Sequence, residues 1–157
     1  PMTWDDWPEI ARNIFQLMRS EAGEEIVLEK NIFVERILFN DSEKGLSDEA
    51  KKEYIRPFKN AGEDRRPTLT WPRQIPIDGS PEAVIDEVTK NGEFHKNSDI
   101  PKLFINADPG TILIGKQREF VRSWANLKEV TVKGNHFVQE DSPREIGEAI
   151  KVFIEKI

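Results

Sequence analysis

Two short strand-like segments near the C-terminal end limit the folds that are open to this chain. Residues 101–107 and 129–132 have the apolar content of buried strands, and a helical segment at 114–125 lies between them. A closing helix is predicted at 143–156, with Ser142 as its N-cap. This order is typical of parallel strands joined by a crossover. Because two strands alone make a poor sheet, we expect the end of a larger α/β sheet.

The front of the chain is predicted to be helical. Apolar residues follow the i, i+3, i+4 spacing of a buried helix face at 5–19, and the same spacing continues over 20–38. A further helix is expected to begin after Ser47, and another spans 81–95. These segments predict several short helices that share one core.

Residues 59–80 interrupt the helical part. Pro and Gly recur through this stretch, which predicts a long irregular loop that is ordered by its few apolar side chains. We therefore expect a helical domain at 1–95 and an α/β part at 96–157. No internal repeat or low-complexity tract divides the chain further.

Charge and composition exclude several classes of partner. The net charge of −6 gives no basic face for nucleic acid. The chain has no cysteine and only two histidines, His95 and His136, far apart in sequence, so we expect no metal site. No apolar run approaches the roughly 20 residues of a membrane helix. The first residues lack the features of a secretory signal, so we expect a cytoplasmic protein, with the periplasm left open.

His136 and Asp108 are the candidates for proton-transfer chemistry. Each is expected just past a strand, where the active sites of open parallel sheets lie. An imidazole in Gly134-Asn135-His136-Phe137 could act as a general base near neutral pH, or it could be a loop histidine without a role. Asp108 could orient His136, although an Asp-Pro-Gly turn explains this residue more simply.

The aromatic side chains of the helical part could serve a core or a pocket. At helical spacing, Trp7, Phe15 and Phe33 are more typical of a core. In the proline-rich loop, Trp71 and Pro72 could equally line an apolar pocket. Composition does not decide between the two roles.

Four long segments together resemble the second subfamily of haloalkane dehalogenases. They are SEAGEEIVLEKNIFVERIL (Ser20–Leu38), RRPTLTWPRQIPI (Arg65–Ile77), IPKLFINADPG (Ile100–Gly110) and GNHFVQEDSPREIGEAI (Gly134–Ile150), in matching order and spacing. The resemblance covers essentially the whole chain. It implies the C-terminal portion of an α/β-hydrolase fold, its last two parallel strands with helices, preceded by a helical cap.

The resemblance also implies roles for particular residues. His136 matches the catalytic histidine, which activates water, and Asp108 matches a secondary carboxylate rather than the main triad acid. Asp41 falls at a variable position at the tunnel mouth, where a charge could alter substrate access. The remaining matches line the substrate pocket: Trp7, Phe15, Phe33, Ile37, Trp71, Pro72, Ile75, Thr111, Ile112 and Phe137.

Other parts of that enzyme have no counterpart in this sequence. The nucleophilic aspartate, the halide-binding tryptophan and asparagine and the triad glutamate all precede the segment that the chain matches. From the Pro1 start we expect a piece of a longer protein, inactive alone, that needs its N-terminal half or a second copy by swapping. The resemblance implies a haloalkane and a halide as ligands and no cofactor.

Two alternatives remain open. Coelenterazine-using luciferases share much of these segments, so the chain could be half of such a monooxygenase. The family's luciferases carry an aromatic pair after the DPG turn, whereas this chain has Thr111 and Ile112, which favours the dehalogenase. The second alternative is a non-catalytic complementation fragment.

Overall fold

A parallel pair of strands forms the sheet that the sequence predicts. The computed structural model describes residues 2–157, so Pro1 and the prediction attached to it lie outside the described residues. Strand β1 (Lys102–Pro109) pairs in parallel with β2 (Leu127–Gly134), from Lys102 opposite Leu127 to Pro109 opposite Gly134. Helix α6 (Lys116–Arg122) makes the crossover. The predicted fold class, with its last two parallel strands, is observed.

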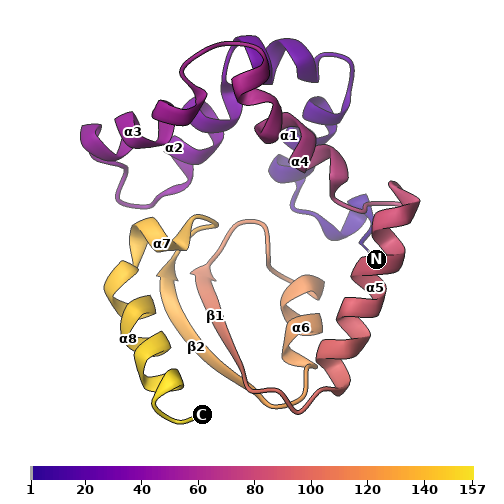
Figure 1. The fold of residues 1–157 in the computed structure, drawn as a ribbon, viewed down its shortest axis with the longest axis vertical. Coiled ribbons are helices and arrows are strands. Elements are labelled where there is room, and N and C mark those ends of the chain that lie inside the picture. Colours follow the sequence, from indigo (N-terminus) through magenta and orange to yellow (C-terminus); the bar gives the residue numbers. More distant parts are fainter. Residues whose placement is uncertain (1) are drawn as a thin grey trace.

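Helices cover the sheet, and the helical cap lies beyond its carboxyl end. In Figure 1, α8 (Pro143–Ile154) lies on one side of the strands, and α6 with α5 (Glu82–Asn97) on the other. Both arrowheads point toward the cap. The short helix α7 (Val138–Asp141) lies between the end of β2 and two helices of the cap, α2 (Phe39–Asp41) and α3 (Asp48–Ile55).

Helix α5 packs against elements of the α/β part. A Cβ at Gly92 would lie 2.9 Å from the Phe120 ring of α6, and His95 stacks on Trp124 at a centroid distance of 4.7 Å. The predicted boundary at residue 95 assigns α5 to the cap. These contacts join α5 to the α/β part, and the boundary itself stays a prediction.

The cap consists of short helical elements. Ser47 caps α3 as predicted, since its Oγ accepts a hydrogen bond from the Ala50 N–H at 3.2 Å. The expected helix at 5–19 is divided at Pro8, which precedes α1. The elements are η1 (Trp4–Asp6), α1 (Glu9–Arg19), η2 (Glu24–Glu29), η3 (Phe33–Leu38), α2 (Phe39–Asp41), α3 (Asp48–Ile55), η4 (Arg56–Phe58), η5 (Glu63–Arg65) and α4 (Arg66–Gln74).

The prediction of an irregular loop at 59–80 is wrong in its middle, which forms η5 and α4. Pro67 lies in the first turn of α4, where a missing N–H removes no helical hydrogen bond. Pro72 lies near the end of α4 and is fully buried, so packing offsets the one bond it removes. The Arg65 guanidinium fixes the start of the helix by donating to the carbonyls of Leu28, Glu29, Phe58 and Lys59.

Ser142 also differs from its predicted role. It precedes α8 as expected, but its Oγ donates to the Lys133 carbonyl at 2.6 Å instead of capping the helix. The hydroxyl therefore ties the start of α8 to the end of β2. Both Ser142 and the neighbouring Asp141 are buried.

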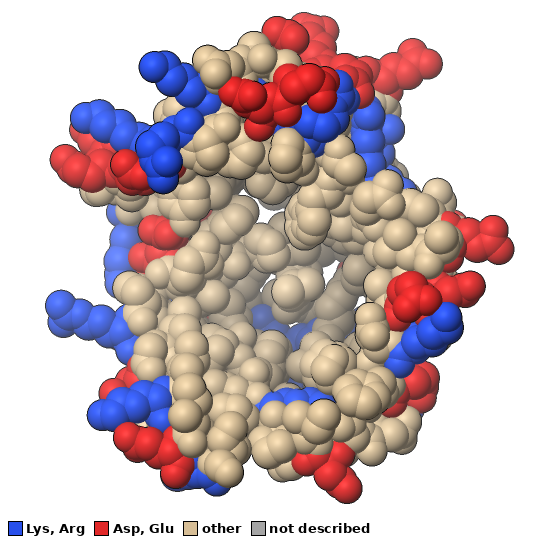
Figure 2. Space-filling view, viewed as in Figure 1, with Lys and Arg blue, Asp and Glu red and all other residues tan. Residues whose placement is uncertain are grey.

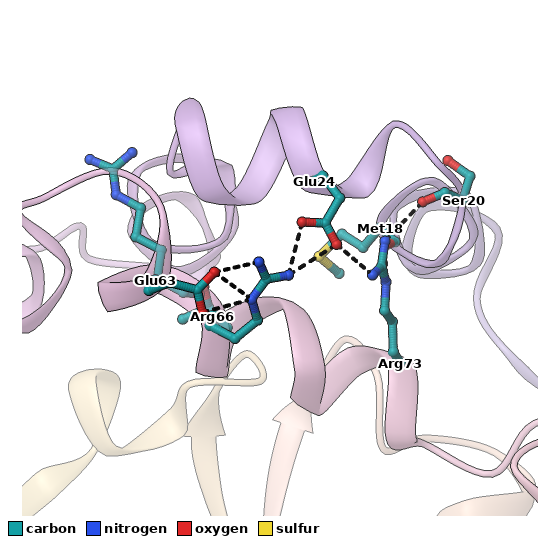
Figure 3. A network of polar contacts seen from close by, with 8 residues as sticks. Met18, Ser20, Glu24, Glu63, Arg66 and Arg73 are labelled. Atoms are coloured by element: carbon teal, nitrogen blue, oxygen red, sulfur yellow. Dashed lines mark hydrogen bonds and ion pairs between the residues drawn. The ribbon is translucent and has the colours of Figure 1, made fainter.

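An ion-pair network joins α4 to the first cap helices. The Glu24 carboxylate bridges Arg66 and Arg73 at 2.8 and 2.9 Å, and Glu63 pairs with Arg66 from the other side (Figure 3). Arg73 also donates to the carbonyls of Met18 and Ser20. The hydrogen bond from Arg66 is the main reason why the pKa of Glu24 lies below its usual range. The network fixes α4 against the end of α1.

The hydrophobic core of the cap lies beneath this network. Its buried side chains come from α1, η2, α4 and the segments beside them: Trp7, Ala11, Phe15, Met18, Val27, Leu28, Leu69 and Ile77. Met18 is 0% exposed, whereas its neighbour Leu17 is 47% exposed.

This difference gives a stability prediction. Met18→Ala should lower the free energy of unfolding by about 2–5 kcal/mol, because it removes buried methylene groups and leaves a cavity. Leu17→Ala is the matched control and should cost much less. Denaturant unfolding measures both values, and equal losses at the two positions would contradict this description of the core.

Large apolar side chains are also exposed. Among residues 2–157, each strand of the two-stranded sheet also has one edge without a neighbouring strand. Leu113 is 58% exposed and Trp71 is 54% exposed. Figure 2 shows uncharged surface across the middle of one face, hollowed between cap and core, with charged side chains mostly around it. Exposed apolar area and open strand edges favour association.

We therefore predict that the 157-residue chain by itself does not stay monomeric. Light scattering coupled to size exclusion should give a mass above the 18.1 kDa of one chain. Leu113→Lys should shift the distribution toward the monomer, because a charge at the exposed position opposes apolar contact. A cooperative, stable monomer at all concentrations would contradict the prediction.

Candidate active site

The candidate base, His136, stands on a short loop just past β2. The preceding Gly134 has φ +149°, and a Cβ there would lie 2.8 Å from the Asp141 Cβ. Only glycine leaves room for Asp141 at this point, so the glycine of the GNHF segment has a packing reason. The loop presents His136 at the carboxyl end of the strand, where the sequence predicts it.

The imidazole of His136 is half-buried beside a small cavity of about 100 Å³. Burial lowers the pKa of His136 below 6.5, while the negative charge of Asp41 acts in the opposite direction. A neutral imidazole can accept a proton near pH 7. The residues that line this cavity with it are mainly apolar: Phe104, Ile105, Ala107, Gly110, Thr111, Leu113, Asn135 and Val138.

Two carboxylates hold the residues on either side of His136. Asp41 Oδ2 accepts from the Phe137 N–H at 2.8 Å, and the Asp41 carbonyl accepts from Asn135 Nδ2 at 2.6 Å. Asp141 Oδ2 accepts from the Asn135 N–H at 3.1 Å. The loop is therefore attached to the cap through one carboxylate and to α7 through the other.

Asp141 also joins the core to the cap. Its Oδ1 accepts from Ser42 Oγ at 2.7 Å, and its carbonyl accepts from Lys44 Nζ at 2.6 Å. Burial alone would raise the pKa of Asp141, but the hydrogen bonds from Ser42, Asn135 and Lys44 outweigh it and leave this pKa below its usual range. The sequence analysis does not single out Asp141, because its partners in the cap are remote in the sequence.

A larger cavity of about 620 Å³ lies between the cap and the loop after β1. Five predicted pocket residues line it: Phe15, Ile37, Asp41, Thr111 and Ile112. The cavity shares Gly110 and Thr111 with the small cavity beside His136, so the DPG loop separates the imidazole from the larger space. Its volume is in the range of small-molecule sites.

The other predicted pocket residues lie around this cavity rather than in its wall. Trp7 and Pro72 are buried in the cap, and Phe33 and Ile75 pack partly against the cap core. Trp71 is exposed, with its ring 6.4 Å from Phe15 and 6.3 Å from Phe33. Phe137 packs edge-on to His136 at 5.2 Å. Their role as pocket residues stays a prediction.

Asp108 differs from its predicted surroundings, and Asp41 has partners that the sequence did not predict. Asp108 lies inside β1, because the strand continues to Pro109, and its side chain is exposed. Among residues 2–157 no hydrogen bond joins it to His136, so the structure gives no support for an orienting role. The resemblance implies a place at the tunnel mouth for Asp41, and this role stays a prediction. In the structure its carboxylate accepts hydrogen bonds from Thr111 and Phe137.

Two further classes of site are absent from residues 2–157. No group of three or more His, Asp or Glu side chains in that range could hold a metal ion. In the same range, no helix is long and apolar enough to cross a membrane.

Several known proteins match the chain over its whole length. It is 53% identical over 159 residues to the haloalkane dehalogenase of Mycolicibacterium smegmatis, and this match covers 100% of the chain and 51% of the relative. It is 50% identical to a haloalkane dehalogenase of Sphingobium indicum, covering 53% of that protein. The coelenterazine h 2-monooxygenase of Renilla reniformis is 43% identical over 99% of the chain and 50% of its own length. No family model matches.

Solved structures agree with these relatives. The crystal structure of the haloalkane dehalogenase DbeA from Bradyrhizobium elkani superposes with a TM-score of 0.93 at 33% identity. This superposition covers 99% of the chain and 55% of that structure. The fold is therefore the C-terminal portion of an α/β-hydrolase, with a histidine at the end of its last strand.

The chain is homologous to the C-terminal half of the haloalkane dehalogenases, which confirms the resemblance in its sequence. It spans about half the length of the curated relatives it matches.

The half-buried His136 gives a pH prediction. Because the pKa of His136 is below 6.5 in the folded state, the unfolded state takes up a proton first as the pH falls. The free energy of unfolding should therefore fall as the pH drops through 6.5. Above that pH, the neutral imidazole of His136 should make its full contribution to this free energy. His136→Gln should remove this part of the pH dependence. Denaturant unfolding at several pH values tests it, and an unchanged profile in the variant would contradict it.

Proposed function

We propose that this chain supplies the cap and the general base of a haloalkane dehalogenase. The observation that carries the proposal is the position of His136, which lies at the carboxyl end of β2 and next to the loop that walls an apolar cavity under the cap. Homology to haloalkane dehalogenases over the whole chain supports the same function. The nucleophile comes from the N-terminal half, supplied in the same or in another polypeptide.

The reaction has two steps in this proposal. A carboxylate oxygen from the N-terminal half attacks the carbon that bears the halogen, the carbon–halogen bond breaks, and the halide leaves with the electron pair. Water then attacks the carbonyl carbon of the resulting ester while His136 takes its proton. The ester bond breaks and the alcohol leaves with a proton returned by the imidazolium. The carboxyl group keeps the second proton of the water and releases it to solvent, which regenerates the carboxylate.

The local structure suits His136 to the second step. Burial keeps the imidazole neutral near pH 7, so it can accept the proton of water. The apolar cavity limits the solvation of the reacting groups, which strengthens the electrostatic interactions inside it. Phe15, Ile37 and Ile112 would contact the alkyl part of a small haloalkane.

A second candidate function is that of a coelenterazine-using monooxygenase. The 43% identity to the Renilla reniformis protein supports it. The higher identity to the dehalogenases, together with Thr111 and Ile112 in place of an aromatic pair, favours the hydrolase.

The test is reconstitution. The 157-residue chain alone should release no bromide from a bromoalkane, because a base without its nucleophile loses most of the rate. Joined to the N-terminal half of the Mycolicibacterium smegmatis relative, it should release bromide catalytically. His136→Ala in the joined protein should reduce turnover on the order of 100-fold or more.

Ion chromatography of bromide and a luminometer with coelenterazine provide the readouts. Turnover by the isolated chain would contradict the assignment of the nucleophile to the other half. Light without bromide would favour the monooxygenase. A folded joined protein with neither activity would favour a non-catalytic fragment.

A further inference from the structure

Every oxygen atom of Asp41 accepts a hydrogen bond, either from the loop that carries His136 or from the DPG loop beside it. Its Oδ1 accepts from Thr111 Oγ1 at 2.9 Å, and its Oδ2 accepts from the Phe137 N–H at 2.8 Å. Its carbonyl accepts from Asn135 Nδ2 at 2.6 Å. One residue of the cap therefore contacts the DPG loop and both neighbours of His136.

We propose that Asp41 is a positioning residue for His136, holding the imidazole in place from the cap. This inference rests on the proposed function. The Asp41 carboxylate fixes the backbone after the base at Phe137, and its carbonyl holds the Asn135 side chain before the base. The bond to Thr111 fixes the loop that separates the base from the cavity. Small displacements of a catalytic group cost large factors in rate, so this anchoring matters for activity.

The two carboxylates at this loop have different origins. Asp141 lies six residues after Asn135 in the chain and holds the loop locally. Asp41 reaches it from α2, 94 to 96 residues earlier. Separation of the cap from the core would therefore release the Phe137 contact while the Asn135 N–H kept its partner. The placement of the base depends on the docking of the cap.

The consequence is specific to one step of the reaction. Halide release depends on the nucleophile, and His136 acts only when water attacks the ester. Loss of the Asp41 contacts should therefore slow ester hydrolysis and leave the first halide release intact. A merely structural defect would reduce both steps together.

Two substitutions separate the hydrogen bonds from the charge. Asp41→Leu removes every side-chain acceptor. Asp41→Asn keeps an acceptor for the Phe137 N–H and can donate to Thr111 Oγ1, but it removes the charge. Glu49→Gln, at an exposed position on α3, is the matched control for loss of one cap charge. The variants are made in the joined protein described under Proposed function and in the 157-residue chain.

Rapid-quench and steady-state bromide assays give the first readout. Asp41→Leu should release about one bromide per protein in a burst and then turn over about 10- to 100-fold more slowly. Asp41→Asn should lose much less turnover. The acidic limb of its pH–rate profile should move to lower pH, because the charge of Asp41 raises the pKa of His136. Asp141 on α7 is unchanged in both variants. The control should match the parent.

Amide hydrogen exchange gives a second readout that needs no activity. In Asp41→Leu the Phe137 amide should exchange faster than in the parent, while the Asn135 amide, bonded to Asp141, should stay protected. This comparison is valid even if the parent releases no bromide, so it separates failure of the positioning role from failure of the proposed function.

Each result has one meaning. A full burst with slow turnover, or selective loss of Phe137 protection, supports the positioning role. Equal loss of burst and turnover, or no change in either amide, overturns it. If Asp41→Leu does not fold, Asp41→Asn decides: its uncharged and therefore weaker acceptor should let the Phe137 amide exchange faster than in the parent while the burst stays full, and unchanged exchange at Phe137 overturns the role.

Discussion

The geometry of the candidate site depends on hydrogen bonds that two carboxylates accept from the tripeptide that carries the base, Asn135–Phe137. Asp41 contacts it from the cap, and Asp141 contacts it from α7. Charge-assisted bonds of this kind are stronger than neutral ones, and they are least screened where burial excludes water. Without them the main chain on either side of His136 would lose its side-chain acceptors. With them, the loop that carries His136 is held between the cap and α7.

The sequence was sufficient for the fold because the fold depends on local patterns. Alternation and apolar runs located both strands, and the Ser47 cap located α3. The homology to haloalkane dehalogenases agrees with what the four long segments predicted. The prediction for residues 59–80 was wrong because it treated every proline as a helix breaker, whatever its position in the helix. Its effect depends on position: Pro67 is harmless in a first turn, and Pro72 is compensated by burial.

The site was predictable only in part, for a related reason. His136 follows a strand and is preceded by glycine, which is a local signal. Asp141 follows the same strand, but its partners Ser42 and Lys44 lie 97 to 99 residues away. No periodicity or motif connects residues at that distance. The same holds for Asp41, whose charge could be read from the sequence while its hydrogen-bond partners could not.

The chain order of these partners has a consequence for protein synthesis. A ribosome makes Asp41 and Ser42 with the rest of the cap, and their partners Phe137 and Asp141 are added 96 and 99 residues later. Until then the cap has its own apolar core, with side chains such as Met18 and Leu69, but lacks these two hydrogen-bond partners. Closing so long a loop is entropically costly, so these bonds should be among the last to form. The base would thus reach its working geometry at the end of folding rather than at its start.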